Sequence, residues 1–129
     1  MEFLTKDMIK KIDHEFEMKK VEIPEWNGYV YVREIRARER DLYEAMTFAI
    51  SDGDPAKAMD NYRARFVVIS ACDENGELLF QPEDAEWLGQ KQVAPVNRIF
   101  KVAREINGLT VEEAEKNFEG ITDVDSVSS

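Results

Sequence analysis

Two spacings of apolar residues divide the chain, and they predict strands near the N-terminus and helices after it. Between residues 18 and 32 apolar and polar residues alternate, which is the pattern of strands that bury one face. From about residue 37 onward apolar residues recur at intervals of three and four, which indicates helices with one buried stripe. The sequence therefore predicts a mainly helical α+β single domain with an N-terminal β-hairpin.

The hairpin is predicted from Asn27-Gly28, which lies between the two alternating runs. Both residues tolerate the positive φ of a type I′ turn. Pro24 has no backbone N–H to donate, so we expect its strand at the edge of the sheet. The alternation places Tyr29 and Tyr31 on one face and the neighbouring valines on the other. These tyrosines are either exposed or packed on the N-terminal helix, and both arrangements stay open.

Capping residues and glycines set the expected bounds of the helices. Thr5 is typical of an N-cap, and Asp54 followed by Pro55 opens a helix that we expect to be the most buried. The second helix lacks a Ser or Thr cap, which predicts a weaker start. The expected helices span residues 4–12, 37–50, 55–72, 82–88, 95–106 and 110–118. The inward stripe expected for helix 37–50 consists of Leu42, Ala45, Met46, Ala49 and Ile50.

The acidic charge is concentrated toward the C-terminus. Of the net charge of −10, residues 110–129 contribute half, since they hold six acids and one lysine. We expect residues 1–118 to form the single domain and the acidic, serine-rich residues 119–129 to be disordered. Nonspecific nucleic-acid binding requires a basic footprint, so we expect no nucleic-acid partner.

Membrane and secretion signals are not expected either. No apolar run approaches the ~18 residues that a membrane span needs. The charged N-terminus does not resemble a signal peptide, and a single cysteine fits a reducing cytoplasm.

Residues with catalytic or metal-binding chemistry are sparse. Cys72 and His14 are each unique and lie far apart in sequence, whereas a zinc site needs about four ligands and a Cys-His nucleophile needs an orienting group. The sequence DENG from Asp73 faintly resembles a calcium loop, but Leu78 occupies the sixth position, where glycine is required, and Asp84 the twelfth, where Glu is required. Nucleotide-binding motifs are absent. We therefore expect no enzyme activity, no metal and no cofactor.

The candidate binding residues are aromatic and basic. Four arginines between residues 33 and 40 alternate with acids, which favours surface salt bridges, with contact to an acidic partner as the alternative. Amphipathic aromatics on a hairpin suit protein contacts. The candidate protein-binding residues are Trp26, Tyr29, Tyr31, Arg36 and Arg40.

Four sequence patches carry a family resemblance through their order and spacing. They are EIPEWNGYVYVREI at 22–35 followed by ERD at 39–41, CDENGELLF at 72–80, INGLT at 106–110 and EKN at 115–117. Together they resemble the tail assembly chaperones of long-tailed, siphovirus-type phages and prophages, over roughly residues 18–118. Two departures are Arg36-Ala37, where the family often has a capping residue and glycine, and Phe118, where it usually has serine.

The resemblance implies a function that composition alone does not. Such proteins bind the tape-measure protein, keep it soluble and promote tail-tube polymerisation around it in the bacterial host cytoplasm, and they are absent from the mature virion. The resemblance also implies a homo-oligomer, and a longer frameshifted form that binds the tail-tube protein. The alternative from charge alone is a small acidic inhibitor, or DNA mimic, of a nucleic-acid-binding enzyme.

Overall fold

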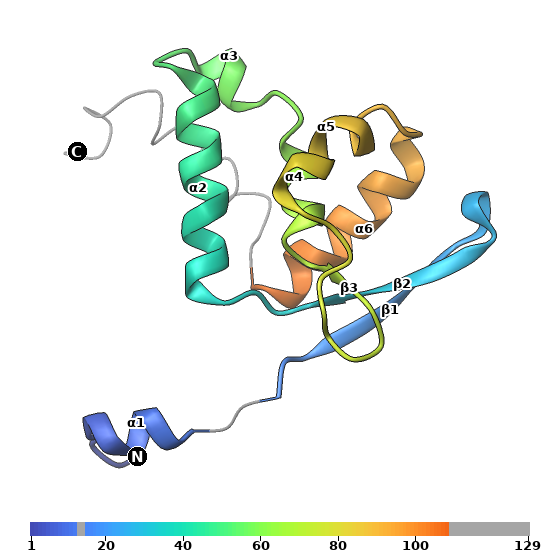
Figure 1. Ribbon diagram of the computed structural model, residues 1–129. Helices are drawn as coiled ribbons and strands as arrows, with labels where there is room; N and C mark the ends of the chain where they lie inside the picture. The colour runs from blue at the N-terminus through green and yellow to red at the C-terminus, as the bar shows by residue number, and fades with distance from the viewer. Residues whose placement is uncertain (13–14, 109–129) are drawn as a thin grey trace.

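The computed structural model describes residues 1–12 and 15–108, which form a three-stranded antiparallel sheet and a set of helices (Figure 1). This is a small α+β fold with an N-terminal hairpin, as the sequence predicts. The expected helix at 110–118, the tail at 119–129 and His14 lie outside the described residues. The elements are α1 (Lys6–Lys11), β1 (Met18–Ile23), η1 (Pro24–Trp26), β2 (Gly28–Arg33), α2 (Ala37–Ser51), α3 (Pro55–Ala58), α4 (Tyr62–Val68), β3 (Ala71–Cys72), η2 (Pro82–Asp84), α5 (Ala85–Leu88) and α6 (Val93–Ile106).

The sheet has the strand order β1-β2-β3, so β1 is an edge strand, as Pro24 predicts. The register pairs Lys20 with Tyr31 and Val21 with Val30. The third strand was not predicted from the sequence, because two residues give no periodicity. It includes Cys72, which the sequence placed at a helix end.

The turn of the hairpin differs from the predicted type I′ turn. Pro24–Trp26 form a turn of 3-10 helix, and Asn27 alone adopts the left-handed conformation, with a φ of 51°. Gly28 is already the first residue of β2 and pairs with Ile23. The prediction was wrong because Pro24 fixes its own φ in the helical range, which starts the turn three residues before Asn27.

The helix predicted over 55–72 is divided by Asn61, whose φ is 56°. It begins as predicted, with the Asp54 carboxylate accepting a hydrogen bond from the Ala56 N–H at 3.0 Å. Five consecutive residues of the second piece, α4, are buried, so this region is the most buried helix, as expected. The chain then leaves the helix and enters β3. Asp73 and Gly76 consequently lie in a loop that follows a strand, and not directly after the helix that the sequence predicts to end at residue 72.

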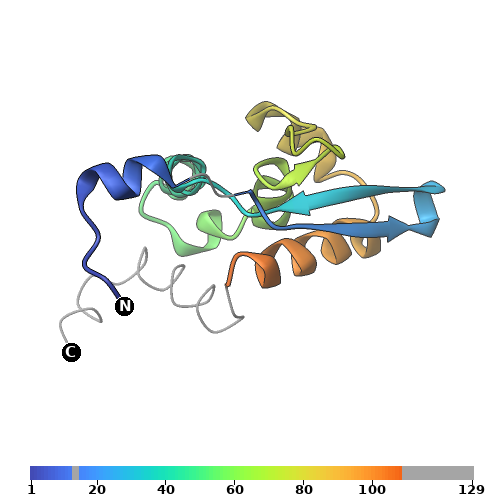
Figure 2. The same cartoon turned by 90° about the horizontal axis from the view of Figure 1, so that it is seen from below.

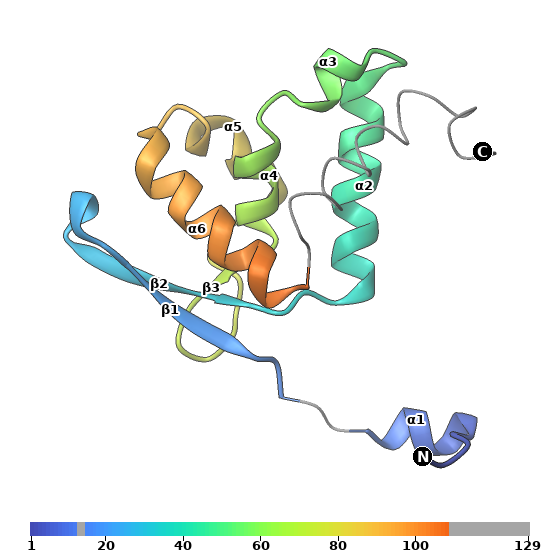
Figure 3. The same cartoon turned by 180° about the vertical axis from the view of Figure 1, so that it is seen from behind.

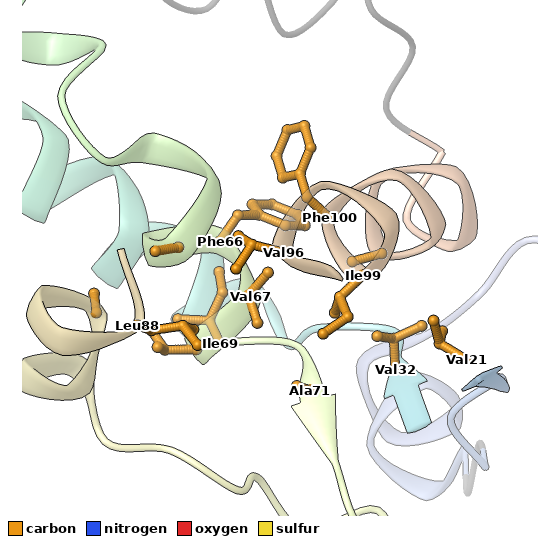
Figure 4. Close-up of a cluster of buried hydrophobic side chains, with 14 of the residues drawn as sticks. Val21, Val32, Phe66, Val67, Ile69, Ala71, Leu88, Val96, Ile99 and Phe100 are labelled. Carbon is orange, nitrogen blue, oxygen red and sulfur yellow. The ribbon is translucent and has the colours of Figure 1, made fainter. Parts of the chain in front are cut away.

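The hydrophobic core lies between the sheet, α4, α5 and α6 (Figure 4). Helix α6 crosses the face of β1 and β2 that carries Val21 and Val32, and it packs against α4 (Figures 1 and 2). Within this core the Phe66 and Phe100 rings meet edge to face, with centroids 5.8 Å apart. Helix α6 starts two residues before the predicted position, with Pro95 in its first turn, and ends at the predicted Asn107-Gly108.

Helix α2 faces the core with its polar side, contrary to prediction. Its buried residues are Thr47 and Ser51, and Tyr43 packs half-buried against the core. Residues 43, 47 and 51 share one face at helical spacing. Of the predicted apolar stripe, Met46 is half-buried beside this face, and Leu42, Ala45, Ala49 and Ile50 are exposed. The sequence correctly predicts the helical period of these residues, but the prediction that the stripe faces the core was wrong.

Candidate protein-interaction surfaces

The tip of the hairpin is fastened to α6 by polar contacts. The Glu25 carboxylate accepts two hydrogen bonds from the Arg98 guanidinium, at 2.7 and 2.8 Å, and this hydrogen bonding lowers the pKa of Glu25 to about 2. The Trp26 indole N–H donates to Oε1 of Gln92, just before α6, at 3.1 Å. Trp26, which is 37% exposed, therefore belongs to the side of the hairpin that meets the helix.

Tyr29 and Tyr31 lie on the opposite face of β2 from the buried Val32. Their rings meet edge to face with centroids 5.8 Å apart, and the Lys20 ammonium lies 4.2 Å from the centroid of Tyr29. Tyr29 is 54% exposed and Tyr31 is half-buried. Of the two arrangements left open by the sequence, packing on the N-terminal helix is not the one observed, because α1 lies away from the sheet (Figures 1 and 3). We call Lys20, Tyr29 and Tyr31 the tyrosine face.

The two candidate arginines lie at the start of α2, apart from the tyrosine face. The Arg36 guanidinium stands 4.8 Å from the centroid of the Phe16 ring and 3.6 Å from the Glu39 carboxylate. Arg40 donates to Glu44 at 3.1 Å. Both arginines therefore have acidic neighbours on their own helix. The predicted residues thus occupy three separate places.

Glu39 supplies the cap that α2 lacks in its sequence. Its carboxylate accepts a hydrogen bond from the Arg36 N–H at 2.7 Å, and two more from the buried Arg33 guanidinium at 3.1 and 2.7 Å. Burial raises the pKa of Glu39, but these hydrogen bonds outweigh it and hold the pKa below its ordinary value of 4.5. Glu39 thereby links the last residue of β2 to the start of α2.

The apolar stripe of α2 is exposed along the outer side of the helix. Leu42 is 42% exposed and Ile50 is 38% exposed, and Phe48, just beside the stripe, is 73% exposed. Ala45 and Ala49 are exposed between them, and Met46 is half-buried. We call Leu42, Ala45, Met46, Ala49 and Ile50 the α2 apolar face.

Residues 1–12 form an N-terminal arm that carries α1 away from the body of the molecule (Figures 1 and 3). The Thr5 hydroxyl caps the helix by accepting from the Met8 N–H at 3.2 Å, as predicted. None of the residues of α1 is buried, although the arm is rich in apolar side chains. The exposed fractions are Phe3 88%, Leu4 51%, Met8 38%, Ile9 55% and Ile12 59%.

Metal-binding groups and the single cysteine are further candidates for a chemical site in the part of the chain that the structure describes. Within residues 1–12 and 15–108, no three His, Cys, Asp or Glu side chains are placed to hold a metal ion. Cys72 is buried, and burial raises the pKa of its thiol, whose sulfur lies 3.8 Å from the Met18 sulfur. Over the same residues, no helix is long and apolar enough to cross a membrane.

Two surfaces were missed by sequence reasoning. Pattern alone assigns the α2 apolar face to the core, and the signal against this was the small size of Ala45 and Ala49, which contribute little to a core. No pattern in the sequence shows that the arm extends from the body.

The sequence profile described as phage tail assembly chaperone matches residues 4–117. The chain belongs to the phage tail assembly chaperone family. This match includes the hairpin, α2 and nearly all of the arm. The family identified from sequence resemblance is thereby confirmed, together with a chaperone role in phage tail assembly.

A solved structure of the family has the same fold. The tail assembly chaperone of bacteriophage HK97 superposes with a TM-score of 0.55 at 21% sequence identity, covering 70% of this chain and 85% of that one. At this identity the likeness concerns the fold. The search of curated proteins found no match.

Proposed function

We propose that this chaperone binds the tape-measure protein of its phage, keeps it soluble, and promotes polymerisation of the tail tube around it. The observation that carries the proposal is the tyrosine face, in which Lys20 and Tyr29 are exposed and Tyr31 is half-buried, on a hairpin that protrudes beyond the helices (Figures 1 and 3). The membership of this chain in the tail assembly chaperone family supplies the context of tail assembly. The chain acts in the cytoplasm of the bacterial host and leaves before the virion matures.

The fastening of the hairpin favours this role physically. Because Glu25 and Trp26 bind the tip to α6, the tyrosines are presented on a rigid support, and little conformational entropy is lost on binding. Tyrosine offers a large apolar ring with a polar end, which suits contact with a partly apolar helix in water. An apolar stripe on a helical client would therefore lie against Tyr29 and Tyr31.

The edge of β1 adds a second mode of contact. Strand β1 pairs with β2 on one side, and no described strand pairs with its other side. A strand edge offers backbone donors and acceptors to an extended segment. Lys19 and Lys20 on this strand disfavour nonspecific pairing and favour an acidic segment.

We further propose that the chain self-associates, and that a longer frameshifted form brings the tail-tube protein to the complex. The acidic surface limits aggregation of the complex, since like-charged particles repel one another. Tail-tube binding would then reside in the added domain and not in residues 1–108.

The test is co-expression with the tape-measure protein encoded by the same phage. The variant Tyr29→Ala/Tyr31→Ala should lower the soluble fraction of the tape-measure protein and its recovery with the tagged chaperone. Val93→Ala is the matched control, because Val93 is 80% exposed at the start of α6, away from the tyrosine face. Wild-type recovery with the tyrosine variant would contradict the assignment of the face.

Sequencing the flanking genes separates this function from the acidic-inhibitor alternative. The chaperone function predicts a tail-tube gene upstream, a long helix-rich reading frame downstream, and a slippery run near the end of this gene. A neighbouring restriction or nuclease system without tail genes would instead support the inhibitor.

A further inference from the structure

The described molecule has two unpartnered apolar surfaces, and they are complementary in shape. The α2 apolar face is flat at its centre, because Ala45 and Ala49 are one helical turn apart and project little. The arm presents larger apolar side chains: Met8 and Ile12 are one helical turn apart on α1 and its C-cap, and Leu4 lies just before the N-cap Thr5. Larger side chains against a row of alanines allow two helices to approach closely.

The two surfaces are also complementary in charge. Residues 1–12 hold three lysines and two acids, whereas residues 41–54, which are the rest of α2 after its first turn and the loop that follows, hold four acids and no base; the arginines of α2, Arg38 and Arg40, precede this segment. The acids Asp41 and Asp52 are exposed on α2 or directly after it. Lysines beside the apolar side chains of the arm would therefore meet carboxylates beside the α2 apolar face.

The arm as placed does not cover the α2 apolar face of its own chain. Helix α1 lies beyond the N-terminal end of α2 and not alongside it (Figures 1 and 3). Phe16, where the chain re-enters the body, stacks on Arg33 and Arg36 at 4.9 and 4.8 Å, which fixes the point from which the arm departs. A second copy of the chain is the partner that can supply the missing helix.

We propose that the N-terminal arm of one copy docks on the α2 apolar face of the next. This rests on the proposed self-association and names its interface. Donor and acceptor surfaces are different parts of the chain, so the contact is head-to-tail, and an open assembly of any length keeps one free arm at one end and one free face at the other. Such a contact builds a ring when the rotation closes and a spiral when it does not. The tyrosine face takes no part and stays open to the client.

The test uses one variant for each surface, and both change exposed residues so that the monomer fold is kept. The arm variant is Leu4→Glu/Met8→Glu, and the face variant is Leu42→Glu/Ala49→Glu. The control is Val93→Glu, which puts a glutamate at an exposed apolar position elsewhere. Analytical ultracentrifugation of each protein, at several concentrations, measures the assembly state, and circular dichroism checks the fold.

The wild type and the control should form concentration-dependent oligomers, and each surface variant alone should sediment as a monomer. An equal mixture of the two variants should give a dimer and nothing larger, because only the intact arm of one and the intact face of the other can pair. A mixture that remains monomeric would overturn the proposal that the arm of one copy docks on the α2 apolar face of another.

Two further outcomes distinguish failure of the arm contact from failure of the proposed self-association. A wild type that stays monomeric at all concentrations overturns both self-association and the arm contact. Oligomers of wild-type size in both surface variants overturn the arm contact alone, since another interface then holds the copies together.

Discussion

Two buried arginines illustrate how single residues organise this molecule. Arg33 is 1% exposed and pairs with the Glu39 carboxylate. Arg65 is 3% exposed, and its hydrogen bonds go to neutral acceptors, namely the Thr47 hydroxyl and the carbonyl oxygens of Ala58 and Asp60. Burial lowers the pKa of Arg65. A buried charge without its partners is strongly destabilising, so each arginine fixes the elements around it.

Glu39→Gln tests the first of these arginines. The variant leaves a buried guanidinium without a charged acceptor, so we expect the free energy of unfolding at pH 7 to fall by about 1–3 kcal/mol. The measurement is urea denaturation followed by circular dichroism.

The pH dependence of the same variant has a defined sign. The folded-state pKa of Glu39 lies below 4.5, so its contribution is complete above that pH and is lost as the pH falls through the folded-state pKa. The stability of the wild type should therefore decrease more between about pH 5 and pH 3 than that of Glu39→Gln. If the stability of the two proteins changes in parallel with pH, the interaction of the Glu39 carboxylate with Arg33 does not contribute to stability.

Gly89 lies so close to Asn61 that a Cβ atom would not fit. A Cβ there would lie 2.1 Å from Oδ1 of Asn61, whose amide donates to the Ala85 carbonyl at 2.8 Å. Gly89→Ala should displace that amide and lower stability by about 1–2 kcal/mol. The same substitution made in an Asn61→Ala background should have a clearly smaller effect, measured as a double-mutant cycle. Equal effects in both backgrounds would place the strain elsewhere.

At the scale of elements, α2 shows how a helix can be stabilised from its polar side. Tyr43 packs its ring edge to face on Phe66, with centroids 5.3 Å apart, and burial raises its pKa to about 12. Thr47 accepts from Arg65, and Ser51 is buried at the end of the helix. Aromatic packing and hydrogen bonds therefore hold the inward face of α2 against the core, and most of the apolar stripe is exposed.

Paired substitutions on the two sides of α2 test this orientation. Tyr43→Ala should lower the free energy of unfolding by about 3 kcal/mol, because it removes a ring packed on the core. Leu42→Ser on the outer side should stay within about 0.5 kcal/mol of the wild type. Thermal and urea unfolding of both variants give the comparison. A larger loss for Leu42→Ser than for Tyr43→Ala would mean that α2 is turned the other way.

The sequence predicts an element well when the residues that determine it are close together in the chain, and poorly when they are far apart. Caps such as Thr5 and Asp54 are local, so the starts of α1 and α3 follow from neighbouring residues. The break at Asn61 does not, because its left-handed backbone is accompanied by a contact with Gly89, 28 positions later in the sequence. The strand β3 likewise exists through its pairing with Tyr31 and Val32. The tyrosine face followed from alternation, whereas the two apolar surfaces required the fold.

At the scale of the whole molecule, the chaperone separates its surfaces. The sheet presents tyrosines on one side and packs on α6 with the other, while the α2 apolar face lies on a different side of the core (Figure 1). A molecule that holds its client on one face and its neighbours on another can form an assembly along a long protein. This separation is the basis of the proposed function.

The central claim is that this chain keeps the tape-measure protein soluble, and its most direct test is a solubility measurement. The full-length tape-measure protein is expressed with and without the chaperone, and its amounts in supernatant and pellet are quantified after centrifugation. The account predicts that the tape-measure protein is mostly in the pellet when expressed alone and moves to the supernatant with the wild-type chaperone. An unchanged pellet fraction in the presence of well-folded, abundant chaperone would contradict the account.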